Sequence, residues 1–343
     1  MTTRAARCAA AFAFVLGGEV GAGGATIAVQ QAEGDGARVE SALDALRRGD
    51  AVDANLAALR DAIERSKDPG ALAKQIGGRL LVEGRYALAA DFLAVARARL
   101  PADGNVASQL GKAHALLQHF DEAVAHLSAA DQLLPAGPHP IVKQFLATAL
   151  AGQQRFDDAV AMAERAIADA RTFNAALPPG RPPLSLVEYE LALADVHYIA
   201  VRFERALQVL DHVAALSPAP DEAAKAALLR AKILDSRADE AGALAAFAAA
   251  RAAAPKSAEA CYESAAFLLR RQRHAEAKPF LEQTVALDPQ HEGAWFNLAR
   301  VLSRVGDAAG GKAASERYRV LHEAKIADDL RFTELRRALA EKQ

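Results

Sequence analysis

The glycine-rich segment at residues 306–313 is the part of the sequence that comes closest to a chemical motif. It reads Gly-Asp-Ala-Ala-Gly-Gly-Lys-Ala and matches the phosphate-binding pattern GxxxxGK[ST] up to its final position. Ala313 stands at that position and has no hydroxyl group to offer a metal ion. The segment also follows a helical pattern over 295–305, whereas the motif requires a preceding strand. We therefore interpret it as a turn between helices.

Histidines and paired acids are the other residues that could do chemistry. His114, His119 and His126 lie close together in the sequence, but no HExxH or CxxC pattern accompanies them, and we expect His114 to pack between helices. Asp121-Glu122 and Asp157-Asp158 recur where helical segments begin, and carboxylates there favour the helix dipole. The sequence also lacks GxSxG and GxGxxG patterns. It predicts a protein that is not an enzyme, with no catalytic residues, cofactor or metal.

The composition narrows the class of protein further. The chain has 343 residues, with 41 Lys and Arg against 43 Asp and Glu, so its net charge is -2. This balance argues against a nucleic-acid partner, because domains that bind nucleic acids are usually basic. Two cysteines are too few for a disulfide scaffold, and an apolar fraction of 52% is too high for a disordered chain. The length suits two ordinary domains or one extended array.

The N-terminal residues have the order of an export signal. Two arginines precede the apolar run Cys8–Leu16, and small residues follow it. The run is too short to span a bilayer, and small-x-small cleavage sites lie after Ala22 and after Ala28. We predict a signal peptide at 1–28 and a linker at 29–36. The mature protein is then periplasmic or secreted, without a stable membrane span; if the segment is retained, the protein is cytoplasmic.

The body of the chain is built on a 34-residue repeat. Six pairs of similar residues in consecutive segments share this offset: Gly77 and Gly111, Tyr86 and Phe120, Ala89 and Ala123, Leu93 and Leu127, Ala96 and Ala130, Pro101 and Pro135. The same phase continues through Phe156, Phe203, Phe247 and Leu281. A period of this length is typical of a helix–turn–helix repeat.

The segment Trp295–Leu302 (WFNLARVL) is similar to the signature W-x2-L-G-x2-Y of the tetratricopeptide repeat (TPR). The chain therefore resembles TPR proteins, and we place the array at 70–310. An atypical helical hairpin at 37–69 precedes it, and capping helices at 311–343 follow it. A proline-rich insertion at 172–186 interrupts it, as either a surface loop or a PxxP ligand. The resemblance implies an all-α, right-handed solenoid of about seven to eight helix-turn-helix units with a C-terminal capping helix.

The repeat has a physical explanation. Each first helix (helix A) has a small residue where we expect the second helix (helix B) to pack closely. These residues are Gly77, Gly111, Ala147, Ala194, Ala231, Ala265 and Ala299. Aromatic residues begin most helices B, and prolines follow several of them, because proline cannot continue a helix. One hairpin cannot bury its apolar face alone, so neighbouring hairpins must share a core.

The TPR resemblance implies that helices A line a concave groove that binds extended peptides or partner helices. The residues placed on that face are Lys74, Asn105, Lys112, Tyr198, Lys232, Tyr262, Arg270, Phe296, Arg300 and Arg304. We expect a basic stripe in the C-terminal half, beside Tyr262 and Phe296, that binds an acidic, partly apolar segment or a free carboxylate. Its members are Lys232, Arg270, Arg300 and Arg304. Gly78 and Gln109 replace the asparagines of the known two-carboxylate clamp, which argues against binding of chaperone tails.

The sequence thus predicts a non-catalytic protein–protein interaction scaffold or adaptor, exported to the cell envelope, that holds a partner peptide or helix in its groove. Two alternatives remain at this level. One is a cytoplasmic regulatory or chaperone-like TPR protein, and the other is a substrate-recruiting subunit of an enzyme complex.

Overall fold

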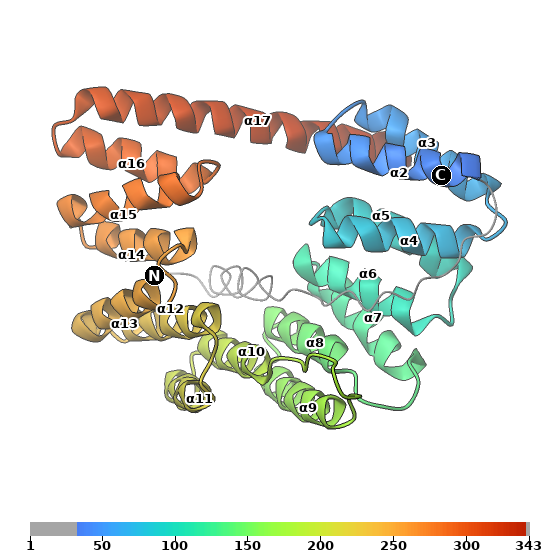
Figure 1. Ribbon diagram of the computed structural model, residues 1–343, viewed down its shortest axis with the longest axis horizontal. Coiled ribbons are helices and arrows are strands. Elements are labelled where there is room, and N and C mark those ends of the chain that lie inside the picture. Colours follow the sequence, from blue (N-terminus) through green and yellow to red (C-terminus); the bar gives the residue numbers. More distant parts are fainter. Residues whose placement is uncertain (1–32, 341–343) are drawn as a thin grey trace. The chain divides into compact units, whose positions relative to one another are not determined.

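The computed structural model describes residues 33–340, and within them the protein is all-α, with 16 helices and no strand (Figure 1). The chain divides into two compact units, one ending at Val209 and the other beginning at Leu210. Each is described separately below. The predicted signal peptide and the first part of the linker lie outside the described residues. The expected all-α solenoid is confirmed.

The first compact unit contains four complete helical hairpins and the start of a fifth. In chain order its helices are α2 (Glu33–Arg48), α3 (Val52–Arg65), α4 (Pro69–Val82), α5 (Tyr86–Arg99), α6 (Gly104–Leu116), α7 (Phe120–Leu133), α8 (Pro140–Gly152), α9 (Phe156–Ala175) and α10 (Leu186–Ile199). Helix α11 (Phe203–Ala215) carries the chain across the boundary between the two units.

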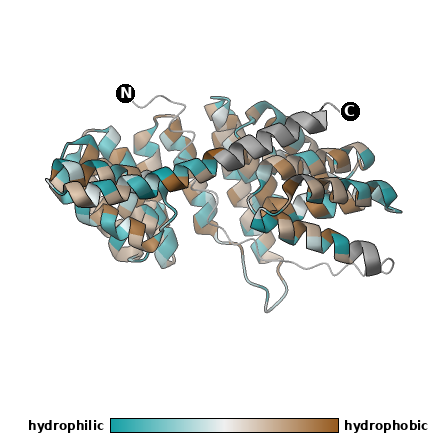
Figure 2. Cartoon of the chain, turned by 90° about the horizontal axis from the view of Figure 1, so that it is seen from above, coloured by the Kyte–Doolittle hydropathy of each residue, from teal (hydrophilic) through white to brown (hydrophobic). Residues whose placement is uncertain are grey.

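The second compact unit contains three further hairpins. Its helices are α12 (Pro220–Ser236), α13 (Glu240–Ala253), α14 (Ala258–Arg270), α15 (His274–Leu287), α16 (Glu292–Arg304) and α17 (Ala308–Ala340). Hydrophobic and hydrophilic residues alternate along these helices, as expected where one side of each faces a core (Figure 2). No helix among the described residues combines the length and apolar character that crossing a membrane would need.

Every hairpin from α4 onward turns in the same way between helix A and helix B. One residue adopts a left-handed conformation with φ between 59° and 89°: Gly84, Gln118, Gln154, Val201, Ala238, Gln272 and Gly306. The residue after it donates its N–H to a carbonyl five positions earlier, as Arg85 does to Leu80 at 2.9 Å. This is the Schellman arrangement, which satisfies carbonyls at the end of helix A.

Val201 is the least suited of these residues to its turn. It is β-branched and has φ 63°, a conformation that costs a residue with a Cβ about 1–2 kcal/mol. We expect Val201→Gly to raise the free energy of unfolding by about 1 kcal/mol, measured by urea denaturation. Val201→Ala is the control, because it keeps the Cβ and should recover less. Equal stability of all three proteins would contradict the expected strain.

The two glycines of the repeat lie where two helices meet closely. A Cβ on Gly77 would stand 2.6 Å from Cγ of Leu93, and one on Gly111 would stand 2.6 Å from Cγ of Leu127. Leu93 and Leu127 are fully buried. The alanines at the same place in later hairpins are buried as well, from 0% exposed at Ala265 to 7% at Ala299. The small residues therefore have the packing role expected from the repeat.

Acidic residues at the starts of helices B link neighbouring hairpins. Asp121 lies in the first turn of α7 and accepts a hydrogen bond from Gln153 at 2.7 Å. Asp157 of α9 pairs with Arg202 at 2.5 Å, and Glu240 of α13 pairs with Arg273 at 2.8 Å. Such exposed pairs contribute about 0–1 kcal/mol each.

The insertion and the C-terminal end differ in detail from the simple repeat. Helix α9 extends to Ala175, and Asn174 fastens the following loop through two 2.8 Å hydrogen bonds with the backbone of Leu184. At the C-terminal end, the sequence predicted an array up to 310 and separate capping helices from 311. A single helix, α17, instead begins as the helix B partner of α16 and continues to Ala340.

Candidate functional site

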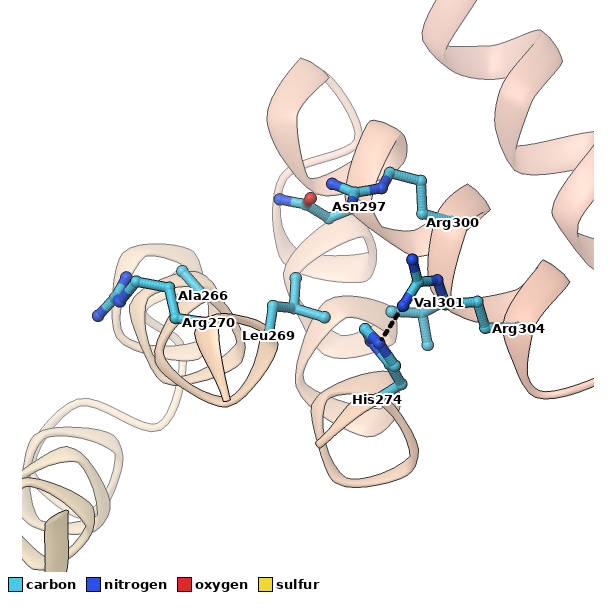
Figure 3. Close-up of a pocket in the computed structure, with 8 residues that line it drawn as sticks. All are labelled: Ala266, Leu269, Arg270, His274, Asn297, Arg300, Val301 and Arg304. Atoms are coloured by element: carbon cyan, nitrogen blue, oxygen red, sulfur yellow. Dashed lines mark hydrogen bonds between the residues drawn. The ribbon is translucent and has the colours of Figure 1, made fainter. Parts of the chain in front are cut away.

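The last two hairpins of the second compact unit enclose a hollow of about 290 Å³ between α14 and α16. We call it the inner hollow. Its lining residues, drawn in Figure 3, are Ala266, Leu269, Arg270, His274, Asn297, Arg300, Val301 and Arg304. Three of these, Arg270, Arg300 and Arg304, belong to the predicted basic stripe. The repeat brings them together because helices A of successive hairpins lie next to each other.

The polar residues of the inner hollow surround an apolar centre. Leu269 and Val301 lie between the two helices A, and Arg304 donates a 2.7 Å hydrogen bond to Nε2 of His274 (Figure 3). Because a guanidinium group can only donate, Nε2 of His274 is the acceptor in this bond. Arg270 extends away from His274 and Arg304 toward the preceding hairpin (Figure 3). The hollow therefore combines cationic groups with a small apolar surface.

A second hollow of about 480 Å³ lies between α16 and α17, and we call it the end hollow. It shares Arg300 and Arg304 with the inner hollow, and its other lining residues are Phe296, Ala299, Ser303, Ser315 and Tyr318. The rings of Phe296 and Tyr318 are 5.2 Å apart, and the Arg300 guanidinium lies 5.4 Å from the centre of the Phe296 ring. Phe296 is 43% exposed. The two arginines thus form a ridge between two hollows.

The cations of the basic stripe differ in whether the protein neutralises them. Lys232 pairs with Glu263 at 3.0 Å, and Arg270 pairs with Asp235 at 2.7 Å. Arg300 and Arg304 have no acidic partner among the residues whose side chains the structure describes. They are also exposed, so their charge is available to a ligand.

The repeat explains why Arg304 lacks an acid. Arg270 and Arg304 occupy the same place in successive hairpins, and the acid that pairs with Arg270 is Asp235 of the preceding helix A. One repeat after Asp235 the sequence has Leu269. Leu269 lines the inner hollow, so a carboxylate is replaced by an apolar side chain at the place where Arg304 would need it.

Two predicted groove residues of the first compact unit are engaged within the protein. Lys74 of α4 forms a 2.7 Å ion pair with Asp103, the residue that caps α6. Burial raises the pKa of Asp103, but hydrogen bonds from Lys74 and from the Val106 N–H outweigh it and lower the pKa overall. Lys112 lies 5.0 Å from the centre of the Phe145 ring, and burial lowers its pKa. Both lysines therefore contribute to contacts between hairpins.

The remaining predicted residues are distributed differently. Asn105 is exposed on α6. Tyr198 is only 8% exposed, with its ring 6.1 Å from that of Phe203, so the structure places it in the core rather than on an accessible face. It lies on α10, a helix A, next to the start of the following helix B. The Tyr262 ring lies 4.3 Å from that of His291, tilted against it, and its hydroxyl accepts a 3.3 Å hydrogen bond from Asn297.

Sequence reasoning missed His274, Asn297, Leu269 and Tyr318 as parts of the candidate site. His274 and Tyr318 lie on helices B, whereas all the predicted groove residues lie on helices A. Leu269 could have been found from the sequence. It stands one repeat after Asp235, so the acid found at this place in α12 is replaced by leucine in α14.

The histidines of α6 and α7 do come close together. Nδ1 of His114 lies 3.4 Å from Nδ1 of His119, and the His114 ring stacks at 5.5 Å on that of His126. Among the described residues, no group of three His, Cys, Asp or Glu side chains could hold a metal ion. Cys261 is buried, and burial raises the pKa of its thiol.

Comparison with known proteins supports the all-α repeat fold. No protein-family model and no curated protein matches the chain. A solved tetratricopeptide repeat protein from Parabacteroides merdae ATCC 43184 is similar, with a TM-score of 0.57 and 12% identity, over 78% of this chain and 98% of that one.

Two other solved structures show lower similarity. YrrB, described as a TPR protein with an unusual peptide-binding site, matches at a TM-score of 0.34 and 17% identity, over 59% of this chain and 95% of its own. The Cut9–Hcn1 complex of the APC/C matches at 0.47 and 13% identity, over 78% of this chain and 48% of that one. The similarity to the Parabacteroides protein, together with the repeated hairpins, shows that this chain has the fold of the tetratricopeptide repeat proteins.

Proposed function

We propose that the protein is a non-catalytic interaction scaffold that binds a segment of a partner protein at the inner hollow. The observation that carries this proposal is the pair Arg300 and Arg304, two exposed cations without an acidic partner in the described part of the chain, beside an apolar centre. In the preceding hairpins, the corresponding cations are already neutralised by Glu263 and Asp235.

The chemistry of the hollow favours an acidic, partly apolar segment. A guanidinium group binds a carboxylate through charge-assisted hydrogen bonds, often two at once. Leu269 and Val301 offer an apolar surface next to the arginines, which suits a hydrophobic side chain of the same segment. An extended segment bound in this way presents alternate side chains to charge and to apolar surface.

Supplying the missing acid within the protein tests this proposal. In Leu269→Asp, the new carboxylate takes the place relative to Arg304 that Asp235 has relative to Arg270. We expect capture of the partner from the native host to fall about tenfold or more, because the charge on Arg304 is then neutralised internally. Quantitative mass spectrometry of wild-type and variant captures measures the loss.

A second variant of the inner hollow and one control variant accompany this experiment. Arg300→Glu should reduce capture as strongly as Leu269→Asp, and Lys312→Glu makes the same charge change at an exposed residue outside both hollows. Equal recovery of the same partner by wild-type protein and by both hollow variants would show that the inner hollow is not the binding site.

We further propose that the protein acts in the cell envelope after export. The support is the sequence of the predicted signal peptide alone. Mass spectrometry of the N-terminal peptide from the native host should find a mature start at Gly23 or Val29. An intact N-terminus beginning at Met1 would instead support a cytoplasmic protein.

A further inference from the structure

The end hollow lies on a surface that the repeat normally covers. Tyr262 of α14 is covered by the start of the next helix A: its ring lies 4.3 Å from that of His291 in a tilted arrangement, and a Cβ on Gly293 would stand 2.8 Å from its hydroxyl oxygen. Phe296 occupies the same place one repeat later and is 43% exposed, and within the described chain α16 is followed by a helix B, α17, alone. The side of the aromatic ring that the next hairpin covers at Tyr262 is therefore open at Phe296.

The opposite wall of the end hollow shows the same contrast. Thr284 and Leu281 of α15 are both fully buried. Their counterparts one repeat later are Tyr318, which is partly exposed, and Ser315, which is exposed. Replacement of a buried leucine by serine removes the side chain that would fill this space, and the end hollow of about 480 Å³ is found there.

The charges show what the missing neighbour should carry. Lys232 of α12 pairs with Glu263 of α14, so a cation on one helix A is neutralised by an acid on the next. Arg300 follows Lys232 at a distance of two repeats and holds the same place in α16. A helix stacked on α16 and α17 with an acid at the place of Glu263 would therefore neutralise Arg300.

From these contrasts, we propose that the end hollow is a second docking site, which takes an amphipathic helix of a partner protein stacked in the place of the next helix A. The helix carries an aspartate or glutamate opposite Arg300 and small residues over Phe296. This site goes beyond the proposed function, because it lies on the other side of the arginine ridge from the inner hollow. A helix in a groove uses apolar anchors on one face and charged residues at its edge.

Helix α14 provides a probe of this chemistry. A synthetic peptide of Ser257–Arg270 contains Glu263, and replacement of Cys261 by Ala prevents oxidation. A short helix is marginal in water, so a staple should join positions 262 and 266. Tyr262 and Ala266 contact or face α16 in the protein, so the staple leaves the face of the peptide that bears Glu263 free.

The test is fluorescence anisotropy of the labelled peptide titrated with the full chain. We expect saturable binding that weakens about tenfold in the protein variant Arg300→Glu, and about tenfold for the peptide with Glu263→Lys. The swapped pair, in which both changes are combined, should restore binding to within about threefold of the original. Lys312→Glu is the protein control, and it should leave binding unchanged.

Other variants separate this site from the inner hollow. Ser315→Leu should fill the end hollow and block the peptide without lowering the melting temperature, whereas Leu269→Asp, which acts on Arg304 and not on Arg300, should weaken peptide binding much less than Arg300→Glu does. Absence of saturable binding, or binding unaffected by both Arg300→Glu and Ser315→Leu, would overturn the proposal. Concentration-dependent dimerisation that Ser315→Leu abolishes would show instead that a second copy of the chain covers this face.

Discussion

Gly77→Ala is expected to destabilise the protein, while the same change at the next residue, Gly78→Ala, is expected to stabilise it. A Cβ on Gly77 would stand 2.6 Å from Cγ and 3.1 Å from the backbone nitrogen of Leu93, which is fully buried. A backbone atom cannot move aside as a flexible side chain can, so the two helices must separate. Overpacking of this kind costs about 1–3 kcal/mol.

Gly78 lies on the same helix in a different environment. A Cβ there would meet only the amide of Gln109, with its nearest atom at 3.4 Å. Since alanine favours a helix over glycine by about 1 kcal/mol, we expect Gly78→Ala to gain up to that amount. Urea denaturation of the two variants measures both effects. A gain of stability in both variants would show that helix propensity, and not the contact between helices, decides these positions.

A larger side chain at Gly77 should have a larger effect. Gly77→Val adds two further carbon atoms toward Leu93, and we expect a loss of about 3 kcal/mol or more. The double variant with Leu93→Ala removes the side chain that the valine meets. The loss in the double variant should therefore be smaller than the sum of the two single losses, and simple additivity would contradict the contact.

Phe267→Ala should give the second large effect, and it should be confined to the second compact unit. Phe267 is fully buried on α14, with its ring 5.1 Å from that of Phe247 and the Arg271 guanidinium 3.8 Å from its centre. Truncation of a buried phenylalanine costs about 3–5 kcal/mol, because apolar contacts are lost and a cavity remains. The cation also loses its aromatic contact.

Hydrogen exchange followed by mass spectrometry tests where this energy is lost. In a repeat protein each hairpin contacts only its neighbours, so amides of α12–α15 should exchange faster while those of α4–α7 remain protected. Phe296→Ala is the matched control, because that ring is 43% exposed and its loss should change stability by less than about 1 kcal/mol. Faster exchange throughout the chain would show that the two compact units unfold together.

The sequence alone determined the repeat and the packing within each hairpin. The residues involved recur at a fixed offset, and each acts on a neighbour in its own hairpin or the next. Gly77 against Leu93 is an example, since a small residue and a leucine at this spacing in a helix–turn–helix unit predict a close contact between two helices. The acids at the starts of α7 and α9 follow the same logic, because helix dipoles act locally.

The tertiary structure was needed to decide which groove residues are free. Lys232 and Arg300 look alike in the sequence, but Lys232 meets Glu263 of the next helix A, whereas Arg300 meets no acid among the side chains that the structure describes. Tyr198 has the spacing of a surface residue but is only 8% exposed, with its ring 6.1 Å from that of Phe203. Charge neutralisation and burial depend on the side chains that neighbouring hairpins contribute. The repeat period therefore predicts where a residue lies in its hairpin, while the packing of hairpins decides whether it can bind a partner.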